Sequence, residues 1–449
     1  MYSTEIENLF KEKNISIGDK VRIIKDNKTY EGILLPRIEF GDSNCIVIKL
    51  DNGYNIGLKY TKDTKLELLQ KGKPIEIVHK THELEKDESK PVVSILGCGG
   101  TIASRIEYRT GGVIATFTPA DLIDSFPEIK ELANINSRKL FNLMSEDMTP
   151  HHWSIIAEEV ANEIKHSCDG VILMHGTDTM HYTSAALSFA LQNLPVPVIL
   201  VGAQRSSDRG SSDNYVNLIC SILAATKSNI AEVMVCMHGS QSDDFCLLHQ
   251  GNRVRKMHTS RRDTFRSINA LPYAKVWYEN RKIEYIREDF RKVDKSRKLE
   301  LVNKFNPNVG LVYIHPAIKP EFISSLSNFY DGVVLAVTGL GHVPTNLTND
   351  KFTKSLIPAI KSLIDSGIPV VVAPQTLYGR LNLNVYAPQR ILKSIGVIGD
   401  GADWLPEVAF VKLSWALGQS KSMDKIKEIM MKNVAGEISD RTNVDYFLV

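Results

Sequence analysis

The sequence has 449 residues, of which 43% are hydrophobic and 24% are charged, and its formal net charge is +2. This composition is typical of a globular chain of two or three domains, and the near-neutral net charge does not argue for binding to nucleic acid or to a membrane surface. No apolar run approaches the ~18 residues of a membrane span, and residues 1–20 lack an apolar signal core. We therefore expect a cytoplasmic protein.

The first part of the chain predicts a small β module. Residues 1 to about 60 read as a short helix followed by β-branched runs that are separated by turn residues such as Gly18-Asp19. Residues 72–90 are charged and weakly apolar, as in a solvated linker. We expect an all-β, barrel-like domain and its linker over residues 1–88. The apolar runs on which this rests are 21–24, 32–35 and 45–50.

After Pro91 the sequence becomes typical of an α/β fold. Continuous apolar runs alternate with helix-like stretches such as 150–166, and runs buried on both faces indicate parallel sheets. We expect one α/β domain over 89–290 and a smaller C-terminal α/β domain over 291–449. The predicted strands are 92–96, 171–174, 196–201 and 233–237 in the first domain, and 309–314, 332–337 and 369–373 in the second.

A basic segment lies between the two α/β units. Residues 275–305 contain the stretch RKIEYIREDFRKVDKSRK. A run of this kind is usually a solvated face or a linker, and the alternative is an RNA contact.

Cysteine and histidine spacing predicts no metal centre. The six cysteines form no CxxC pair, so in a cytoplasmic chain they are expected to be free core thiols. His175, His181 and His238 lack the spacing of metal ligands and are interpreted as structural. The chain also has no P-loop and no clear GxGxxG, so it is not expected to bind a nucleotide.

The polar loops that follow the predicted strands carry the candidate chemistry. GCGGTIAS, HGTDTM, GAQRSSD and HGSQSDD each follow an apolar run. Because functional loops of parallel sheets lie at the carboxyl ends of the strands, we expect these loops to converge on one crevice.

Two threonines in these loops allow two interpretations. Thr101 follows two glycines at an expected helix start, so it is either an N-cap or a nucleophile beside backbone N–H groups. Thr177-Asp178 is either a turn or a hydroxyl next to a carboxylate. A threonine nucleophile needs a proton acceptor, and a lysine can serve when its surroundings favour the neutral amine. Spacing alone does not select the lysine.

Both loops resemble known signatures. Gly97–Ala103 resembles the TGGTIA signature of bacterial-type L-asparaginases, and His175–Thr179 resembles their second signature, HGTDT. The resemblance covers about residues 91–440 and implies a two-domain asparaginase-like fold. It implies that Thr101 is the nucleophile and that Thr177, Asp178 and Lys256 are catalytic.

The same resemblance implies the substrate-binding residues. Ser145 and Glu146 match the pair that grips the α-carboxylate and amine of the substrate, and Gly100 and Gly176 are also expected to bind the substrate. Tyr108 is matched to the lid tyrosine. Cys98 departs from the signature, at a position that is not the nucleophile.

The whole chain is similar to the D subunits of archaeal glutamyl-tRNA(Gln) amidotransferases, which carry a β module in front of the asparaginase part. The resemblance of this chain to them implies that it hydrolyses glutamine or asparagine. The ammonia would pass to a partner (GatE), which holds ATP and Mg²⁺ and amidates Glu-tRNA(Gln). The resemblance implies no cofactor in this chain, and a homodimer within a heterotetramer. The segments that carry it are 103–112, 203–213, 251–263, 339–342, 374–386 and 405–418.

Two alternatives remain at this point. The first is a free-standing L-asparaginase, against which the β module argues. The second is a non-catalytic tRNA-binding or scaffold protein, against which the intact set of Thr101, Thr177, Asp178 and Lys256 argues.

Overall fold

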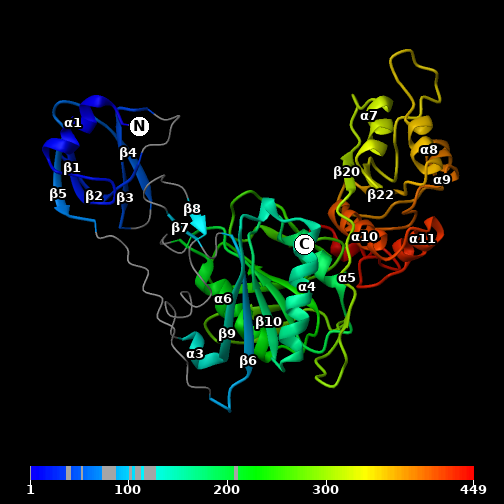
Figure 1. The fold of residues 1–449 in the computed structure, drawn as a ribbon, viewed down its shortest axis with the longest axis horizontal. Helices are drawn as coiled ribbons and strands as arrows, with labels where there is room; N and C mark the ends of the chain where they lie inside the picture. The colour runs from blue at the N-terminus through cyan, green and yellow to red at the C-terminus, as the bar shows by residue number, and fades with distance from the viewer. Residues whose placement is uncertain are drawn as a thin grey trace.

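A computed structural model describes residues 2–36, 42–51, 54–72, 87–100, 104–106, 113–115, 128–206 and 211–448. The N-terminal module, blue in Figure 1, consists of helix α1 (Thr4–Glu12) and a five-stranded antiparallel sheet of order β4-β3-β2-β1-β5. Asp26 and Asn27 both have positive φ and join β1 to β2, as the tight hairpin turns require. The strands are β1 (Lys20–Lys25), β2 (Lys28–Leu34), β3 (Cys45–Leu50), β4 (Asn55–Lys59) and β5 (Lys65–Gln70).

The central domain is built on an eight-stranded mixed sheet of order β18-β17-β14-β13-β12-β10-β6-β9. The four predicted apolar runs of this domain form neighbouring parallel strands, which confirms the α/β expectation. The parallel strands are β6 (Val92–Gly99), β9 (Asn134–Leu143), β10 (Gly170–Met174), β12 (Val198–Val201) and β13 (Val233–His238).

The sheet continues beyond β13 with antiparallel strands that the sequence did not predict. They are β14 (Phe245–Gln250), β17 (Ala274–Trp277) and β18 (Ile283–Tyr285). The last two lie in or at the edge of the basic segment 275–305. β9 was also missed, because this edge strand reads NINSRKLFNL and lacks a continuous apolar run.

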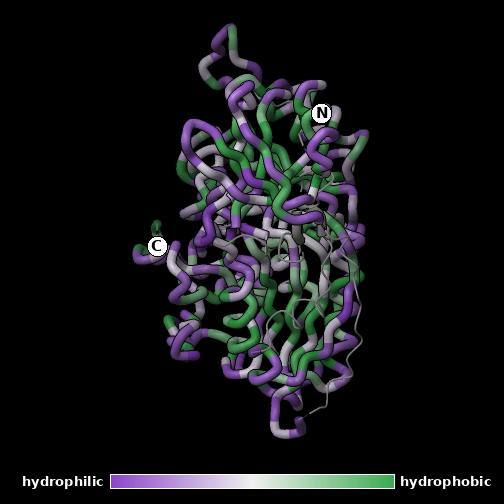
Figure 2. The backbone as a smooth tube through the Cα atoms, turned by 90° about the vertical axis from the view of Figure 1, so that its left-hand side faces the viewer, coloured by the Kyte–Doolittle hydropathy of each residue, from purple (hydrophilic) through white to green (hydrophobic). Residues whose placement is uncertain are grey.

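Alternate residues of β10 pack in two different core clusters, so both faces of this sheet are covered. Val171 and Leu173 pack in one core cluster with α4 (Pro150–Lys165) and α5 (Met180–Ala190). Ile172 and Met174 pack in a second cluster with α6 (Asn214–Lys227). Successive strand side chains point to opposite faces, so a strand between two helix layers must be apolar throughout. In Figure 2, much of the tube in the interior of the molecule is green, which marks hydrophobic residues.

Short elements complete the central domain. The β15–β16 hairpin is the one that matters for the site, since it carries Lys256. The elements are β7 (Ser104–Ile106), β8 (Val113–Ala115), α3 (Ile129–Leu132), the 3-10 turn η2 (Ser145–Asp147), β11 (Leu191–Gln192), β15 (Val254–Lys256), β16 (Phe265–Ser267) and β19 (Glu300–Leu301).

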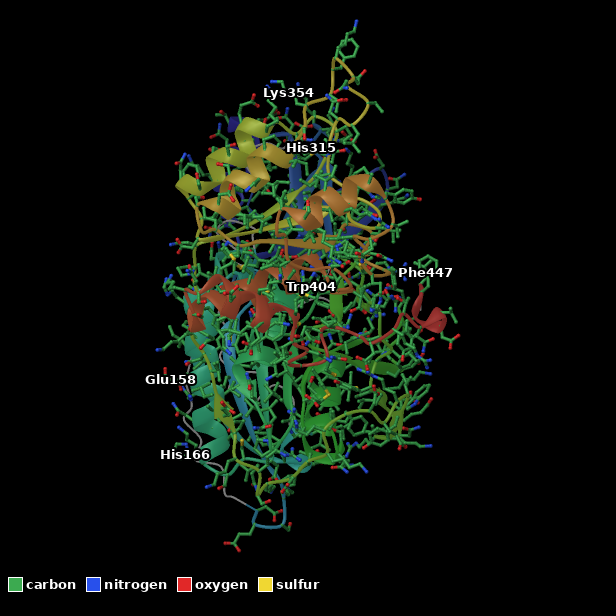
Figure 3. The ribbon with its side chains drawn as sticks, turned by 90° about the vertical axis from the view of Figure 1, so that its right-hand side faces the viewer. Glu158, His166, His315, Lys354, Trp404 and Phe447 are labelled. Carbon is green, nitrogen blue, oxygen red and sulfur yellow. The ribbon has the colours of Figure 1, made fainter. Side chains whose placement is uncertain are left out.

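The C-terminal domain has a three-stranded parallel sheet of order β20-β21-β22, formed by the three apolar runs predicted there. Its helix α10 packs against α5 of the central domain, and Trp404 lies where the two domains meet (Figures 1 and 3). The elements are β20 (Val309–Tyr313), α7 (Pro320–Ser325), η3 (Leu326–Asn328), β21 (Gly332–Val337), α8 (Ile357–Asp365), β22 (Val370–Pro374), α9 (Ala387–Ser394), α10 (Pro406–Gln419), α11 (Met423–Met431) and η4 (Val444–Tyr446).

Within the described residues, no helix is long and apolar enough to cross a membrane. Five of the six cysteines are buried, and Cys45 is half-buried. Burial raises the pKa of Cys98 to about 12, so this thiol in the first signature loop stays protonated at neutral pH.

Candidate active site

The loops predicted to converge follow the carboxyl ends of parallel strands β6, β10, β12 and β13, which lie side by side. The expected nucleophile Thr101 and the expected lid residue Tyr108 lie outside the described residues. Gly100, which precedes Thr101, is described and buried. The position of the first signature loop can therefore be followed up to Gly100.

Close backbone contact joins the two signature loops. Gly100 has φ +85°, and a Cβ built on it would lie 2.4 Å from Cα of Gly176. A Cβ built on Gly176 would lie 2.7 Å from Cβ of Ser145, which is itself buried. These contacts allow no side chain, so glycine is required at both positions. The fold thus brings Gly100, Gly176 and Ser145 together, while Glu146, next to Ser145, is exposed.

Gly100→Ala is expected to impair the site because its Cβ would collide with backbone of Gly176. Positive φ adds strain at a non-glycine residue. We expect at least about a tenfold loss of amide hydrolysis, since small displacements of reacting groups cost about that much or more. Rates of ammonia release and the thermal midpoint test this. Gly367→Ala is the control, since Gly367 also has positive φ (+87°) but open space around it. Equal losses in the two variants would contradict the loop-contact explanation.

Lys256 joins Thr177 and Asp178 in one cluster. Its Nζ donates to Thr177 Oγ1 at 2.9 Å and to Asp178 Oδ1 at 2.6 Å. The Thr177 and Lys256 side chains are largely buried, whereas 65% of the Asp178 side chain is exposed. Thr177 follows β10 and Lys256 ends β15, so residues far apart in the chain meet here. A hydroxyl, an amine and a carboxylate at hydrogen-bond distance are the parts of an activated nucleophile or an activated water.

Two histidines near this cluster are buried and neutral. The Nδ1 of His175 donates to the carbonyl of Gly176, and its Nε2 accepts from the hydroxyl of Thr183. Burial lowers the pKa of His175 to about 4. Burial, with the charges of Arg255 and Lys256, lowers the pKa of His181 to about 3. Neither is protonated at neutral pH, and His175 serves to orient the second signature loop.

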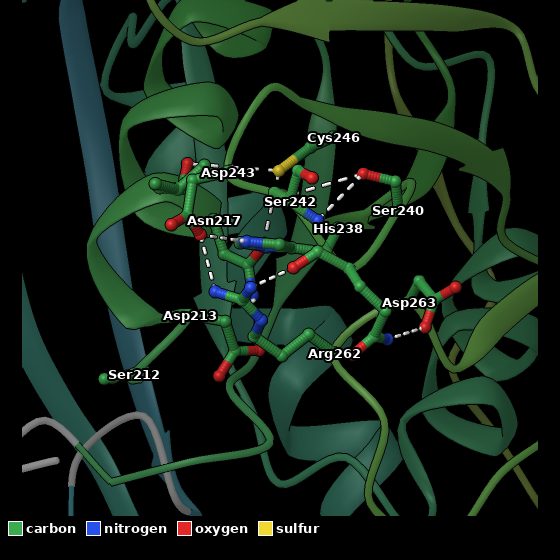
Figure 4. A network of polar contacts seen from close by, with 12 residues as sticks. Ser212, Asp213, Asn217, His238, Ser240, Ser242, Asp243, Cys246, Arg262 and Asp263 are labelled. Carbon is green, nitrogen blue, oxygen red and sulfur yellow. Dashed lines mark hydrogen bonds and ion pairs between the residues drawn. The ribbon is translucent and has the colours of Figure 1, made fainter. Parts of the chain in front are cut away.

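A polar network that the sequence did not reveal supports the loops after β12 and β13 (Figure 4). Asp213 accepts the backbone N–H groups of Gln204 and Arg205 and so closes the loop after β12. His238 connects Asn217 to Asp243, with 3.0 Å between its Nε2 and Asp243 Oδ1. Arg262 Nη1 donates to the same carboxylate at 2.6 Å.

Arg262 lies six positions after Lys256, so this network connects the segment after β15 to the loop after β13. The signal for it in the sequence was the pair of loops GAQRSSD and HGSQSDD, within or shortly after which Asp213 and Asp243 supply the hydrogen-bond acceptors. Within the described part of the chain, no three His, Cys, Asp or Glu residues are grouped so that they could hold a metal ion.

Family models match three consecutive regions of the chain. Residues 15–69 match the GatD N-terminal domain, residues 92–291 match the N-terminal asparaginase family, and residues 308–430 match the glutaminase/asparaginase C-terminal domain. The regions follow one another in the order of the three expected domains. The roles expected for individual site residues stay predictions.

Relatives match the chain over its full length. The chain is 48% identical to the D subunit of glutamyl-tRNA(Gln) amidotransferase from Pyrococcus furiosus, with 99% of this chain and 100% of that protein covered. It is 47% identical to the corresponding protein of Methanobrevibacter smithii, with 99% of each covered. Among solved structures, the thermostable L-asparaginase of Thermococcus kodakarensis has a TM-score of 0.68 and 28% identity, and covers 78% of this chain and 100% of its own. The chain therefore belongs to the family of glutamyl-tRNA(Gln) amidotransferase D subunits, which is built on the asparaginase fold.

Proposed function

We propose that this chain hydrolyses the side-chain amide of glutamine or asparagine and supplies the ammonia to a partner protein. The partner, GatE, uses ATP to convert Glu-tRNA(Gln) to Gln-tRNA(Gln). The observation that carries the proposal is the contact of Lys256 with Thr177 and Asp178, beside the loop that leads into Thr101. The full-length relatives named as D subunits support the same reaction.

The chemistry follows from the groups at the site. Thr101 attacks the amide carbon, its oxygen forms an ester as the C–N bond breaks, and ammonia leaves with the transferred proton. Backbone N–H groups beside the glycines stabilise the oxyanion. A water near Thr177 then cleaves the acyl-threonine, with Lys256 and Asp178 handling its proton. The 2.9 Å between Nζ and Oγ1 is within the range for direct proton transfer. Ser145 and Glu146 hold the α-carboxylate and amine of the substrate.

The N-terminal module favours this proposal over a free-standing L-asparaginase. The L-asparaginase of T. kodakarensis is matched over its whole length yet covers 78% of this chain. The D-subunit relatives cover 99% of it, including the module matched by the GatD N-terminal domain. A non-catalytic tRNA-binding or scaffold role is disfavoured by the assembled Lys256 cluster.

The remaining parts of the proposal concern the assembly. This chain holds no cofactor, and ATP and Mg²⁺ bind to GatE. Two copies of this chain and two of GatE form a heterotetramer in the cytoplasm. Direct transfer of ammonia within that assembly keeps it unprotonated and therefore nucleophilic.

Thr101→Val tests the proposal. Because valine keeps the shape of threonine and removes its hydroxyl, glutamine hydrolysis should fall by at least about 10³-fold, as it does for other catalytic nucleophiles. Amidation of Glu-tRNA(Gln) by the complex should persist when ammonium chloride replaces glutamine. Both rates are measured with the purified chain and with the complex. Glutamine-dependent activity retained in this variant would refute the assignment of Thr101.

A further inference from the structure

The strand that carries Lys256 also binds the C-terminal domain. In β15 successive side chains point to opposite sides. Lys256 reaches Thr177 and Asp178, whereas the neighbouring Arg255 donates from Nε to Glu407 Oε1 at 2.7 Å. Glu407 lies in the first turn of α10 and is 3% exposed. Adjacent residues of β15 therefore belong to two different contacts: Lys256 to the cluster with Thr177 and Asp178, and Arg255 to an ion pair between the domains.

A second arginine just before β15 makes the same connection. Arg253 is 2% exposed and donates to the carbonyl and the carboxylate of Asp403, which lies shortly before α10. It also donates to the carbonyl of Gly436 and the hydroxyl of Ser439. Buried, charge-assisted hydrogen bonds of this kind are strong and directional. We call Arg253 and Arg255, with Asp403 and Glu407, the interdomain clamp.

Packing around Lys256 is incomplete on the side of the clamp. A cavity of about 510 Å³ is lined there by Asp178, His181, Arg255, Lys256 and Glu407. The Oε2 of Glu407 and the Nδ1 of His181 are buried and have no hydrogen-bond partner among the described residues. Because a cavity borders the hairpin, close packing does not hold Lys256 in place on this side. Lys256 is held by its hydrogen bonds to Thr177 and Asp178 and by the pairing of β15 with β16, and the contact between Arg255 and Glu407 adds a restraint from the C-terminal domain.

We propose that Glu407, acting through Arg255, positions the Lys256 amine against Thr177 and Asp178, so that the C-terminal domain controls the proton-handling group of the central domain. The inference rests on the proposed function. Glu407 is a positioning residue, since it contacts Arg255 and not the reacting groups. A shift of α10 moves Arg255, and Lys256 moves with it because the two residues are adjacent in one strand.

Glu407→Gln and Arg255→Lys test the clamp in the full-length chain. Glutamine keeps an acceptor oxygen and removes the charge, and lysine keeps the charge and removes the planar fork. Each variant should lower kcat for glutamine hydrolysis about tenfold or more, with KM changed less than about twofold, because a misplaced group affects the chemical step. The pH profile of kcat should shift as well, since the environment of the Lys256 amine changes.

Matched controls separate positioning from general stability. Arg138 Nε donates to Glu163 Oε1 at 2.9 Å, in a similar arginine–glutamate pair between β9 and α4. Arg138→Lys and Glu163→Gln should keep the wild-type kcat and pH profile at comparable thermal midpoints. Glu407→Gln should also add no further loss to the residual rate of Lys256→Met, because it acts through that amine.

Several outcomes would overturn the inference. The first is a wild-type kcat and pH profile in both Glu407→Gln and Arg255→Lys. The second is a loss of kcat in these variants equal to that in the Arg138 and Glu163 controls. The third is a full additional loss of rate when Glu407→Gln is combined with Lys256→Met. Any of these leaves the proposed function intact as long as the wild-type chain hydrolyses glutamine. Absence of hydrolysis by the wild-type chain and its complex would refute the proposed function itself, and the inference with it.

Discussion

Lys256→Met should lower glutamine hydrolysis by about 10²–10⁴-fold, the range that a positioned proton-transfer group contributes. Methionine preserves the length and much of the packing of the lysine stem but provides no amine for Thr177 or Asp178. The free energy of unfolding should change by less than about 1 kcal/mol, because Asp178 is largely exposed and its ion pair is screened by water. Ammonia release and chemical denaturation together measure both effects.

Lys275→Met provides the comparison for this variant. Lys275 pairs with Glu284 at 3.7 Å between β17 and β18, at the antiparallel edge of the eight-stranded sheet, whereas Lys256 lies in the separate β15–β16 hairpin. Its loss should leave the hydrolysis rate unchanged. A Lys256→Met enzyme that retained more than about a tenth of the wild-type rate would show that another group handles the proton.

Lys412→Met should be strongly destabilising. Lys412 and Glu437 are both 0% exposed, with 2.5 Å between Nζ and Oε1. The same ammonium donates to the carbonyls of Met430 and Lys432. Burial lowers the pKa of Lys412, and the attraction of Glu437 opposes part of that shift. Removing the lysine leaves a buried carboxylate without its partner, which costs about 3–5 kcal/mol.

Urea unfolding followed by circular dichroism measures this loss. Adding Glu437→Gln should recover part of it, because the amide carries no charge and its one oxygen, in the place of Oε2, can still accept from the N–H groups of Val434 and Ala435. Lys361→Met is the control, because its partner is Asp365 in an exposed pair on α8, and such pairs contribute little. Equal destabilisation by Lys361→Met and Lys412→Met would contradict this account.

The clamp and the buried pair act on the same helix in different ways. Glu407 lies in the first turn of α10 and contacts the hairpin of Lys256, whereas Lys412 in α10 holds the C-terminal end of α11 and the residue that follows it. We therefore expect the Glu407 variant to change kcat more than stability, and the Lys412 variant to change stability more than kcat.

Local patterns were sufficient for the strands that lie inside the sheets. Val171–Met174 is apolar at every position because helices cover both faces of β10. A run of consecutive apolar residues is therefore enough to predict this strand. The edge strands and the antiparallel strands of the central sheet were harder to predict. β9 and β18 carry polar and charged residues on a solvated side, and β14 and β17 pair with neighbours in antiparallel order that an apolar run does not reveal.

The sequence by itself determined the α/β organisation, the two signature loops and their family. The glycines at 100 and 176 and the polar residues after each strand are local features, and parallel strands necessarily bring their carboxyl ends to one edge. The resemblance singled out Lys256, and the tertiary structure added that its amine meets Thr177. Only the tertiary structure decided how the loops after β12 and β13 are supported, and that Arg253 and Arg255 attach the Lys256 hairpin to α10. The contacts of Lys256 with Thr177 and of the two arginines with Asp403 and Glu407 join residues about 80 to 150 positions apart, and such pairs are specified by the packing of whole domains rather than by any repeating pattern along the chain.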